Sequence, residues 1–225
     1  MKTISSILLT AALFCFVLFN ATAQKNYASF KFGIKAAQPS GASSEEMISS
    51  IGAFTAGVRL EHALSKRFTL MTGVDLNARG FSFQEESGLD ADATSFYFEH
   101  RIAYVDVPLA IRWQLGSDKI GLHFIGGTSL GFATIVRENT IYSHQVEGQE
   151  EKMDNSEKLD FEEAGYERFN AAILLGTGIY VGIGRSQLFF DLTMDAGLTP
   201  LIEGEDSSTF VGADFSLGIR MPLGK

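Results

Sequence analysis

Alternation of apolar and polar residues with a period of two is the feature that most constrains this chain's fold. Residues 103–115, AYVDVPLAIRWQL, show it clearly. One face carries only apolar side chains, including Leu109 and Trp113, and the other carries Asp106 and Arg112. Because successive side chains of an extended strand point to opposite faces, this pattern predicts a strand with one apolar side and one charged side. What surrounds each side decides the class of protein.

The same alternation recurs along most of the chain. It marks eight segments, residues 27–37, 51–62, 67–83, 96–115, 120–134, 169–182, 187–199 and 209–223. Each is long enough for a strand, and the third and fourth are expected to be long ones. The pattern predicts an all-β chain with antiparallel strands.

The connections between these segments alternate in length. Those after the second, fourth and sixth segments are short turns, whereas the others are long, polar and acidic: residues 38–50, 84–95, 135–168 and 200–208. Outer-membrane barrels have short periplasmic turns and longer extracellular loops. The spacing therefore predicts an eight-stranded antiparallel up-and-down transmembrane β-barrel with both ends of the chain on the periplasmic side.

Two closed architectures fit eight alternating strands, and they differ in where the apolar face points. A soluble lipocalin-like barrel lines a cavity with apolar side chains, whereas a membrane barrel turns them toward lipid. The polar parity of these segments carries six cations, six anions and nine glycines. An eight-stranded barrel is only just wide enough for its own side chains, so small residues and mutually neutralising charges suit its interior. We therefore favour the membrane barrel.

The predicted interior is a polar network with a structural role. Its members are Lys31, Lys35, Arg59, Glu61, Asp75, Arg79, Asp106, Arg112, Asp191, Asp195, Asp214 and Arg220. Equal numbers of each sign are expected because an unpaired buried charge is costly. The acidic surplus lies elsewhere, since the four long connections contain 19 of the 27 Asp and Glu residues. Such a filled interior should conduct ions poorly.

The first residues, MKTISSILLTAALFCFVLFNATAQ, predict an export signal. One lysine precedes an apolar run of 16 residues, and Ala-Thr-Ala follows before Gln24. A membrane-spanning helix needs about 20 apolar residues, and a small-x-small triplet is typical of a signal-peptidase site. We expect residues 1–23 to be cleaved and residues 24–225 to form the barrel domain in the outer membrane. Removal of Cys15 would leave no thiol and so no disulfide.

Three stretches also carry a family resemblance. They are SFKFGIKAA, FTLMTGVDLNARGFSF and YVDVPLAIRWQL, the last of which resembles a Tyr-hydrophobic-acid-Ile-Pro-Leu-Leu pattern. The chain is similar in these stretches to the PorT-like outer-membrane β-barrel family that is abundant in Bacteroidota. The resemblance covers nearly the whole of residues 24–225 and implies a fold and a location, while fold alone does not assign an activity.

The sequence offers little catalytic chemistry. A net charge of −9 argues against nucleic acid as a partner. The four histidines lack the spacing of a metal site. Neither a nucleophile-elbow nor a phosphate-loop motif occurs in the sequence. We therefore expect that the protein binds no metal or cofactor and is not an enzyme. A Ser/His/acid group at the rim, near His100 or His144, is the enzymatic alternative. The acidic segment 135–168 is read as a solvated loop, with cation binding as its alternative.

Three further expectations concern local structure. His123 should face the interior and join the polar network. Pro108 has no N–H to donate and is expected to mark a bulge or kink. Aromatic residues near segment ends are candidates for interfacial girdles: Tyr27, Phe68, Phe81, Phe83, Phe96, Tyr97, Phe98, Trp113, Phe132 and Phe210.

These features together predict a monomeric, non-enzymatic barrel that contacts outer-membrane lipid. Its expected role is envelope structure or surface interaction through acidic extracellular loops. One alternative is an accessory component of secretion or surface assembly that contacts other envelope proteins. Another is a soluble exported lipocalin-like binder.

Overall fold

The computed structural model describes residues 25–40, 49–87, 94–146, 149–161, 165–202 and 209–224. These residues form nine antiparallel strands: β1 (Asn26–Ser40), β2 (Ser49–Ala63), β3 (Phe68–Ser87), β4 (Thr94–Gly116), β5 (Ile120–Val146), β6 (Gln149–Leu159), β7 (Phe169–Ile183), β8 (Ser186–Gly197) and β9 (Thr209–Leu223). Within the same residues, no helix is long and apolar enough to cross a bilayer. The predicted signal, residues 1–23, lies outside the described part.

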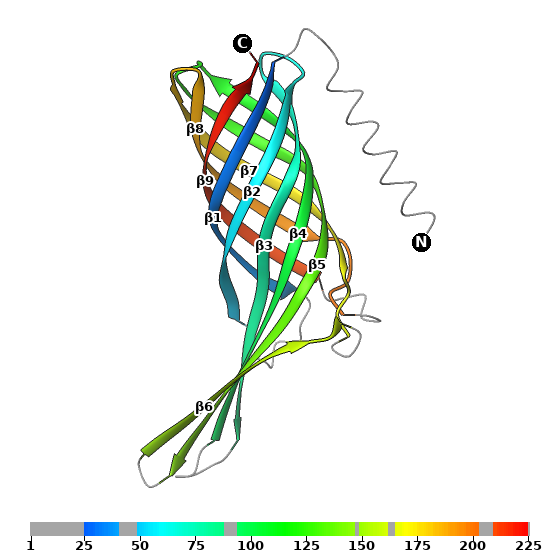
Figure 1. Ribbon diagram of the computed structural model, residues 1–225, viewed down its shortest axis with the longest axis vertical. Coiled ribbons are helices and arrows are strands. Elements are labelled where there is room, and N and C mark those ends of the chain that lie inside the picture. The colour runs from blue at the N-terminus through cyan, green and yellow to red at the C-terminus, as the bar shows by residue number, and fades with distance from the viewer. Residues whose placement is uncertain are drawn as a thin grey trace, which may run out of the picture.

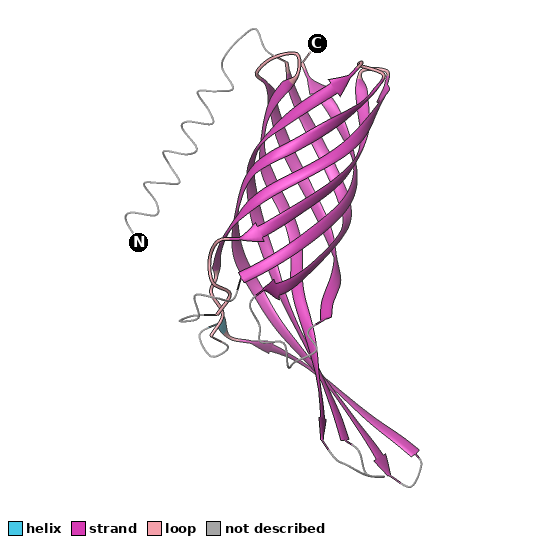
Figure 2. Ribbon diagram, turned by 180° about the vertical axis from the view of Figure 1, so that it is seen from behind, coloured by secondary structure: helices cyan, strands magenta, loops and turns pink. Residues whose placement is uncertain are grey.

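Eight of these strands close into a barrel, whose wall is seen from two sides in Figures 1 and 2. The sheet order is β4-β3-β2-β1-β9-β8-β7-β5-β6, and an additional β4–β5 pairing closes the ring. β9 pairs with β1 over their whole length, from Asn26↔Leu223 to Ser40↔Thr209. The expected eight-stranded antiparallel barrel is thus confirmed.

The ninth strand corrects the prediction that residues 135–168 form a loop. β5 continues past the barrel to Val146, and β6 pairs with this continuation from Val136↔Leu159 to Val146↔Gln149. The earlier part of β5, residues 120–132, lies in the barrel wall and pairs with β7. The hairpin was missed because apolar alternation reports burial, whereas β6 is held by backbone pairing and is exposed over residues 155–158.

The apolar parity of the wall points outward. On β4, Leu109 is 54% exposed and Ile111 is 45% exposed, whereas Asp106 and Arg112 are buried. The same arrangement holds on β9, where Leu217 is exposed and Asp214 is buried. A lipocalin-like barrel requires the opposite direction, so that alternative is wrong. An outer skin of this kind suits hydrocarbon and not water.

Where β4 and β5 continue past the barrel toward β6, the outward side chains become polar and the inward ones apolar. On β4, Arg101 faces outward while Ile102 is fully buried. On β5 the reversal follows a bulge, because Ala103 pairs with Ile135 while Tyr104 pairs with Ala133, which leaves Thr134 as the extra residue. An apolar exterior gives way here to a polar exterior over an apolar core. The reversal therefore marks the level at which the wall leaves the membrane for water.

The bulge also corrects the expectation for Pro108. The β4–β5 register runs without a shift through Pro108↔Ser129, and the irregularity lies instead between Ala103 and Tyr104. On the other side, the β3–β4 pairs stop at Thr72↔Leu109 and resume at Asp75↔Asp106 in the same register. Proline removes a ladder hydrogen bond, and the strands tolerate this local gap without an inserted residue.

The aromatic girdle is present only in part. Phe68 stacks on Trp113 with ring centroids 6.3 Å apart, and Trp113 lies 5.7 Å from Phe124, so these three exposed rings cluster near the short-turn end. Phe132 is likewise exposed. Phe81 and Phe210 were assigned to the wrong side, because both are buried in an interior apolar cluster. Tyr27, Tyr97 and Phe98 are half-buried, and the side chains of Phe83 and Phe96 lie outside the described part.

Replacement of a lipid-facing leucine by arginine tests the direction of the wall. Leu109→Arg places a charge at the middle of the apolar stretch of β4 and should destabilise the barrel by about 2–4 kcal/mol in denaturant unfolding from phospholipid vesicles. Ile135→Arg, just above the polarity reversal, is the matched control and should cost about 0–1 kcal/mol. Equal losses for the two variants would contradict the placement of the membrane boundary.

Candidate functional site: the charged barrel interior

All twelve residues of the predicted network have buried side chains, and six strands contribute them in pairs. Relative exposures range from 0% for Glu61 and Asp191 to 7% for Asp75. β1 provides Lys31 and Lys35, and β2, β3, β4, β8 and β9 provide the other pairs: Arg59 and Glu61, Asp75 and Arg79, Asp106 and Arg112, Asp191 and Asp195, and Asp214 and Arg220. The same parity that carries charge in the sequence faces the lumen in the structure.

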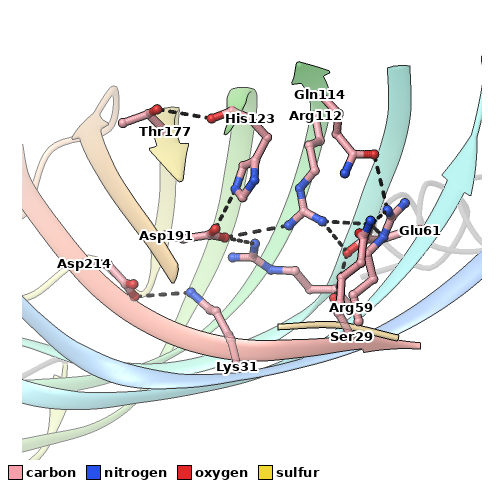
Figure 3. Close-up of polar contacts among 12 residues, drawn as sticks. Ser29, Lys31, Arg59, Glu61, Arg112, Gln114, His123, Thr177, Asp191 and Asp214 are labelled. Atoms are coloured by element: carbon pink, nitrogen blue, oxygen red, sulfur yellow. Dashed lines mark hydrogen bonds and ion pairs between the residues drawn. The ribbon is translucent and has the colours of Figure 1, made fainter. Parts of the chain in front are cut away.

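The layer nearest the short turns is organised around one carboxylate, Glu61. Arg112 Nη1 lies 3.0 Å from both Glu61 oxygens, and Arg220 Nε lies 2.7 Å from Glu61 Oε2. Ser29 Oγ donates a further hydrogen bond of 2.8 Å to the same carboxylate (Figure 3). Two guanidinium groups therefore share one anion.

The middle layer links three carboxylates through Lys31 and Arg59. Lys31 Nζ lies 3.1 Å from Asp75 and 3.2 Å from Asp214, while Arg59 Nη2 donates to Asp75 at 2.9 Å. Asp191 connects this layer to the one beside it, since its oxygens lie 4.0 Å from Arg59 and 3.7 Å from Arg112 (Figure 3). The ion pairs of these two layers thus form one continuous network and not isolated pairs.

His123 belongs to this network, as the parity of β5 predicts. Its Nε2 lies 2.6 Å from Asp191 Oδ1, and its side chain is 1% exposed. The imidazole stacks on Tyr180 with centroids 6.1 Å apart. A histidine enclosed in this way positions Asp191 and has no access to a substrate.

The layer nearest the projecting ends of β3, β4 and β5 is built around Arg79. Its Nη2 donates to Asp106 at 2.8 Å, and its Nη1 donates to Asn170 Oδ1 at 2.5 Å. Lys35 and Asp195 form a 2.7 Å pair in the same layer. Hydrogen bonds from neutral groups supplement the ion pairs, which is what makes a buried network of charges tolerable.

Aromatic rings on the same parity support the arginines. Arg79 lies 4.4 Å above the Tyr104 ring and Arg220 lies 3.7 Å above the Tyr27 ring. Arg112 is 5.3 Å from the centroid of Phe189. The sequence analysis missed Tyr104 and Phe189 as interior partners because it counted charges, although their parity on β4 and β8 already indicated the inward side.

The glycines on the inward parity make room for these groups. A Cβ at Gly57 would overlap the carboxylate of Asp75, and one at Gly178 would lie 2.5 Å from His123 Nε2. The interior retains a cavity of about 20 Å³ beside Lys31 and Asp106. That volume holds about one water molecule. The barrel is filled at this level, so its interior provides no wide aqueous channel.

An apolar cap that the sequence analysis did not predict lies above the charged layers. Its buried residues are Ala37, Phe81, Ile102, Tyr104, Ala133, Val136, Phe161, Leu201 and Phe210. Phe161 and Leu201 come from the connections after β6 and β8, which are joined by an Ile202–Tyr166 bridge and a 3.0 Å bond from Glu167 N to Leu201 O. The cap was missed because each connection supplies single apolar residues within an acidic stretch.

His100 and Tyr166 connect the cap to the strands above the membrane boundary. Tyr166 Oη lies 3.1 Å from His100 Nδ1, and His100 stacks on Phe81 with centroids 5.2 Å apart. Burial lowers the pKa of His100 and raises the pKa of Tyr166 to about 12. Burial therefore favours the neutral form of both groups, which suits an apolar cap.

Histidine and acidic clusters do not assemble into a metal site in the described residues. No group of three or more His, Cys, Asp or Glu side chains there is arranged to hold an ion. His62 lies 2.6 Å from Asn26, and His100 contacts Tyr166 and Glu138. The side chain of His144, the second histidine of the enzymatic alternative, lies outside the described part.

The comparisons with known proteins agree with this architecture. Residues 22–203 match the outer membrane protein beta-barrel domain family, and the chain belongs to that family. Membership implies an outer-membrane location. The comparison with curated proteins gives no match.

The solved structures that the chain matches are distant in sequence. Ail of Yersinia pestis is 12% identical, with a TM-score of 0.40 over 88% of this chain and 99% of that one. OprG of Pseudomonas aeruginosa is 10% identical, with a TM-score of 0.44 over 90% and 98%. The outer membrane protease OmpT of Escherichia coli is 7% identical, with a TM-score of 0.34 over 90% and 98%. At such distances these proteins assign no activity to this chain.

Removal of the shared carboxylate tests the network. Glu61→Gln leaves Arg112 and Arg220 without their common anion, so the free energy of unfolding should fall by about 3–5 kcal/mol. Glu99→Gln removes the partner of the exposed Arg101 and should cost less than about 1 kcal/mol. Denaturant titration of both variants in the same detergent measures the difference, and equal effects would contradict a network held by Glu61.

Proposed function

We propose that this protein is a non-enzymatic outer-membrane barrel that holds a four-stranded sheet above the membrane for contacts at the cell surface. The polarity reversal on β4 and β5 carries the proposal. On the barrel side of this reversal the outer face of the wall is apolar and suits lipid. On the side of the projecting strands the outer face is polar, at Arg101 and Arg137. The parts of the strands that continue past this level are therefore suited to contacts in water.

The sheet above the barrel consists of the outer parts of β3, β4 and β5 together with β6. β3 and β4 pair as far as Ser87↔Thr94, and β4 and β5 pair as far as Thr94↔His144. Figure 1 shows these strands projecting well past the ends of the other barrel strands. Residues 135–146 of β5 alone extend about 40 Å at about 3.3 Å per residue. Such a projection is a large surface for a partner to contact.

The interior supports a non-enzymatic and non-porin role. Its charges are paired with one another, and His123 is bound to Asp191 and 1% exposed. A substrate would have to displace buried ion pairs to reach any of these groups. The protein thus contributes its wall and its projecting sheet, not a lumen for transport.

The acidic long connections favour a partner with basic groups. They hold 19 of the chain's 27 Asp and Glu residues. We propose lipid as the partner of the wall and a monomer as its state, because the closed ring leaves no unpaired barrel edge among the described strands. The stretch YVDVPLAIRWQL also supports kinship with PorT-like barrels of Bacteroidota. A stoichiometric envelope or secretion protein in detergent extracts would favour the accessory role instead.

Epitope insertion in intact cells tests this orientation. A tag inserted between residues 147 and 148, in the connection from β5 to β6, should bind antibody on intact cells, since the strand ends on either side, Val146 and Gln149, belong to the projecting sheet. A tag of the same length in the β7–β8 turn, after Gly184, is the control and should be detected only after permeabilisation. Detection of the Gly184 tag alone on intact cells would overturn the proposed orientation.

A further inference from the structure

A second cavity lies at the short-turn end of the barrel. Its volume is about 280 Å³, far larger than the interior one. The first residues of β1, the last of β9 and the β4–β5 and β7–β8 turns line it. It therefore forms a mouth that opens on the side opposite the projecting sheet.

Cations outnumber anions around this mouth. Lys25 and Arg185 stand at its rim as exposed side chains, and Arg220 lies at its base with 3% exposure. Asp118 is the one acidic residue among the described residues that line it. In the layer directly beneath, Glu61 is shared between Arg220 and Arg112. Among the described lining residues, the three cations Lys25, Arg185 and Arg220 against the one anion Asp118 leave a formal surplus of two positive charges.

The base of the mouth is rigid. Arg220 is held by Glu61, lies 3.7 Å over the Tyr27 ring, and donates to Gln187 Oε1 at 3.0 Å. Gln187 and Tyr27 themselves line the cavity. Its Nε faces the Glu61 carboxylate, whereas its Nη groups donate to neutral acceptors, among them Gln187 Oε1 and Thr69 Oγ1. A guanidinium fixed in this way in a concave site is preorganised to attract an anion.

We infer that this mouth binds a phosphate dianion, either as free inorganic phosphate or as a phosphomonoester headgroup. A phosphate monoester carries about −1.5 to −2 charges at neutral pH, which matches the surplus of the lining. Arginine and lysine both bind phosphate oxygens, arginine through its planar fork. The cavity also has space for a group attached to the phosphorus. The inference rests on the barrel geometry and goes beyond the proposed surface role, which could fail without affecting it.

Titration with inorganic phosphate tests the site on the folded full chain in a maltoside detergent, which contains no phosphate. Isothermal calorimetry should show saturable binding at one site. The double variant Lys25→Gln/Arg185→Gln should weaken binding at least about tenfold, because it removes two charge-assisted contacts. The control Lys66→Gln/Arg67→Gln removes the same charge from the exposed β2–β3 turn, which does not line the cavity, and should change affinity less than about twofold.

Both double variants change exposed residues only, so each should retain the resistance of the folded barrel to unfolding in detergent, which is checked before titration. Absence of saturable phosphate binding to the wild-type chain would overturn the inference. Equal weakening in the two double variants would overturn it as well, since that result reports general charge attraction.

The source of the phosphate is separated by repeating the titration in lipid nanodiscs. If a lipid headgroup occupies the mouth, phosphatidic acid in phosphatidylcholine discs should weaken the apparent phosphate affinity of the wild-type chain by competition. The affinity of the control variant should fall in the same way. If free phosphate is the ligand, both affinities should be unaffected by phosphatidic acid. Either result supports a phosphate site and identifies its source.

Discussion

The structure depends on mutual neutralisation of charges inside a ring that hydrocarbon surrounds. A closed barrel satisfies every backbone group without water, but its outer skin must then be largely apolar, so the charged side chains of the spanning strands turn inward. An eight-stranded ring leaves no room for enough water to solvate them. Sharing of Glu61 by Arg112 and Arg220, and of Asp75 by Lys31 and Arg59, is the consequence.

The same strands serve two solvents, and the change from one to the other is local. β4 keeps its register with β3 through the membrane boundary but exchanges the character of its faces between Asp106 and Ile102. β5 does so through one extra residue, Thr134, whose hydroxyl donates to Ala103 O at 3.2 Å. Bulges are commonly placed at barrel rims, where they re-aim side chains and increase twist. Here the bulge joins a lipid-facing wall to a water-facing sheet.

Sequence reasoning predicted the barrel well because lipid enforces a strict period of two. The inward direction of Asp106, Arg112 and His123 follows from parity alone. Sequence reasoning failed where lipid no longer enforces this period of two. The β6 hairpin has no apolar face to reveal it, and the cap draws Phe161 and Leu201 from separate connections, a long-range contact that no local pattern encodes. Phe81 and Phe210 were assigned to a girdle because nearness to a segment end was given more weight than parity.

The measurement that tests the account most directly is fluorescence quenching by lipid-borne nitroxides at single cysteines along β4. With Cys15 replaced by serine, labels at Val107, Leu109 and Ile111 should be quenched strongly. A label at Arg101 should be quenched weakly, although it lies on the same side of the strand. Strong quenching at Arg101, or none at Leu109, would contradict the central claim that hydrocarbon meets the apolar parity and ends at the polarity reversal.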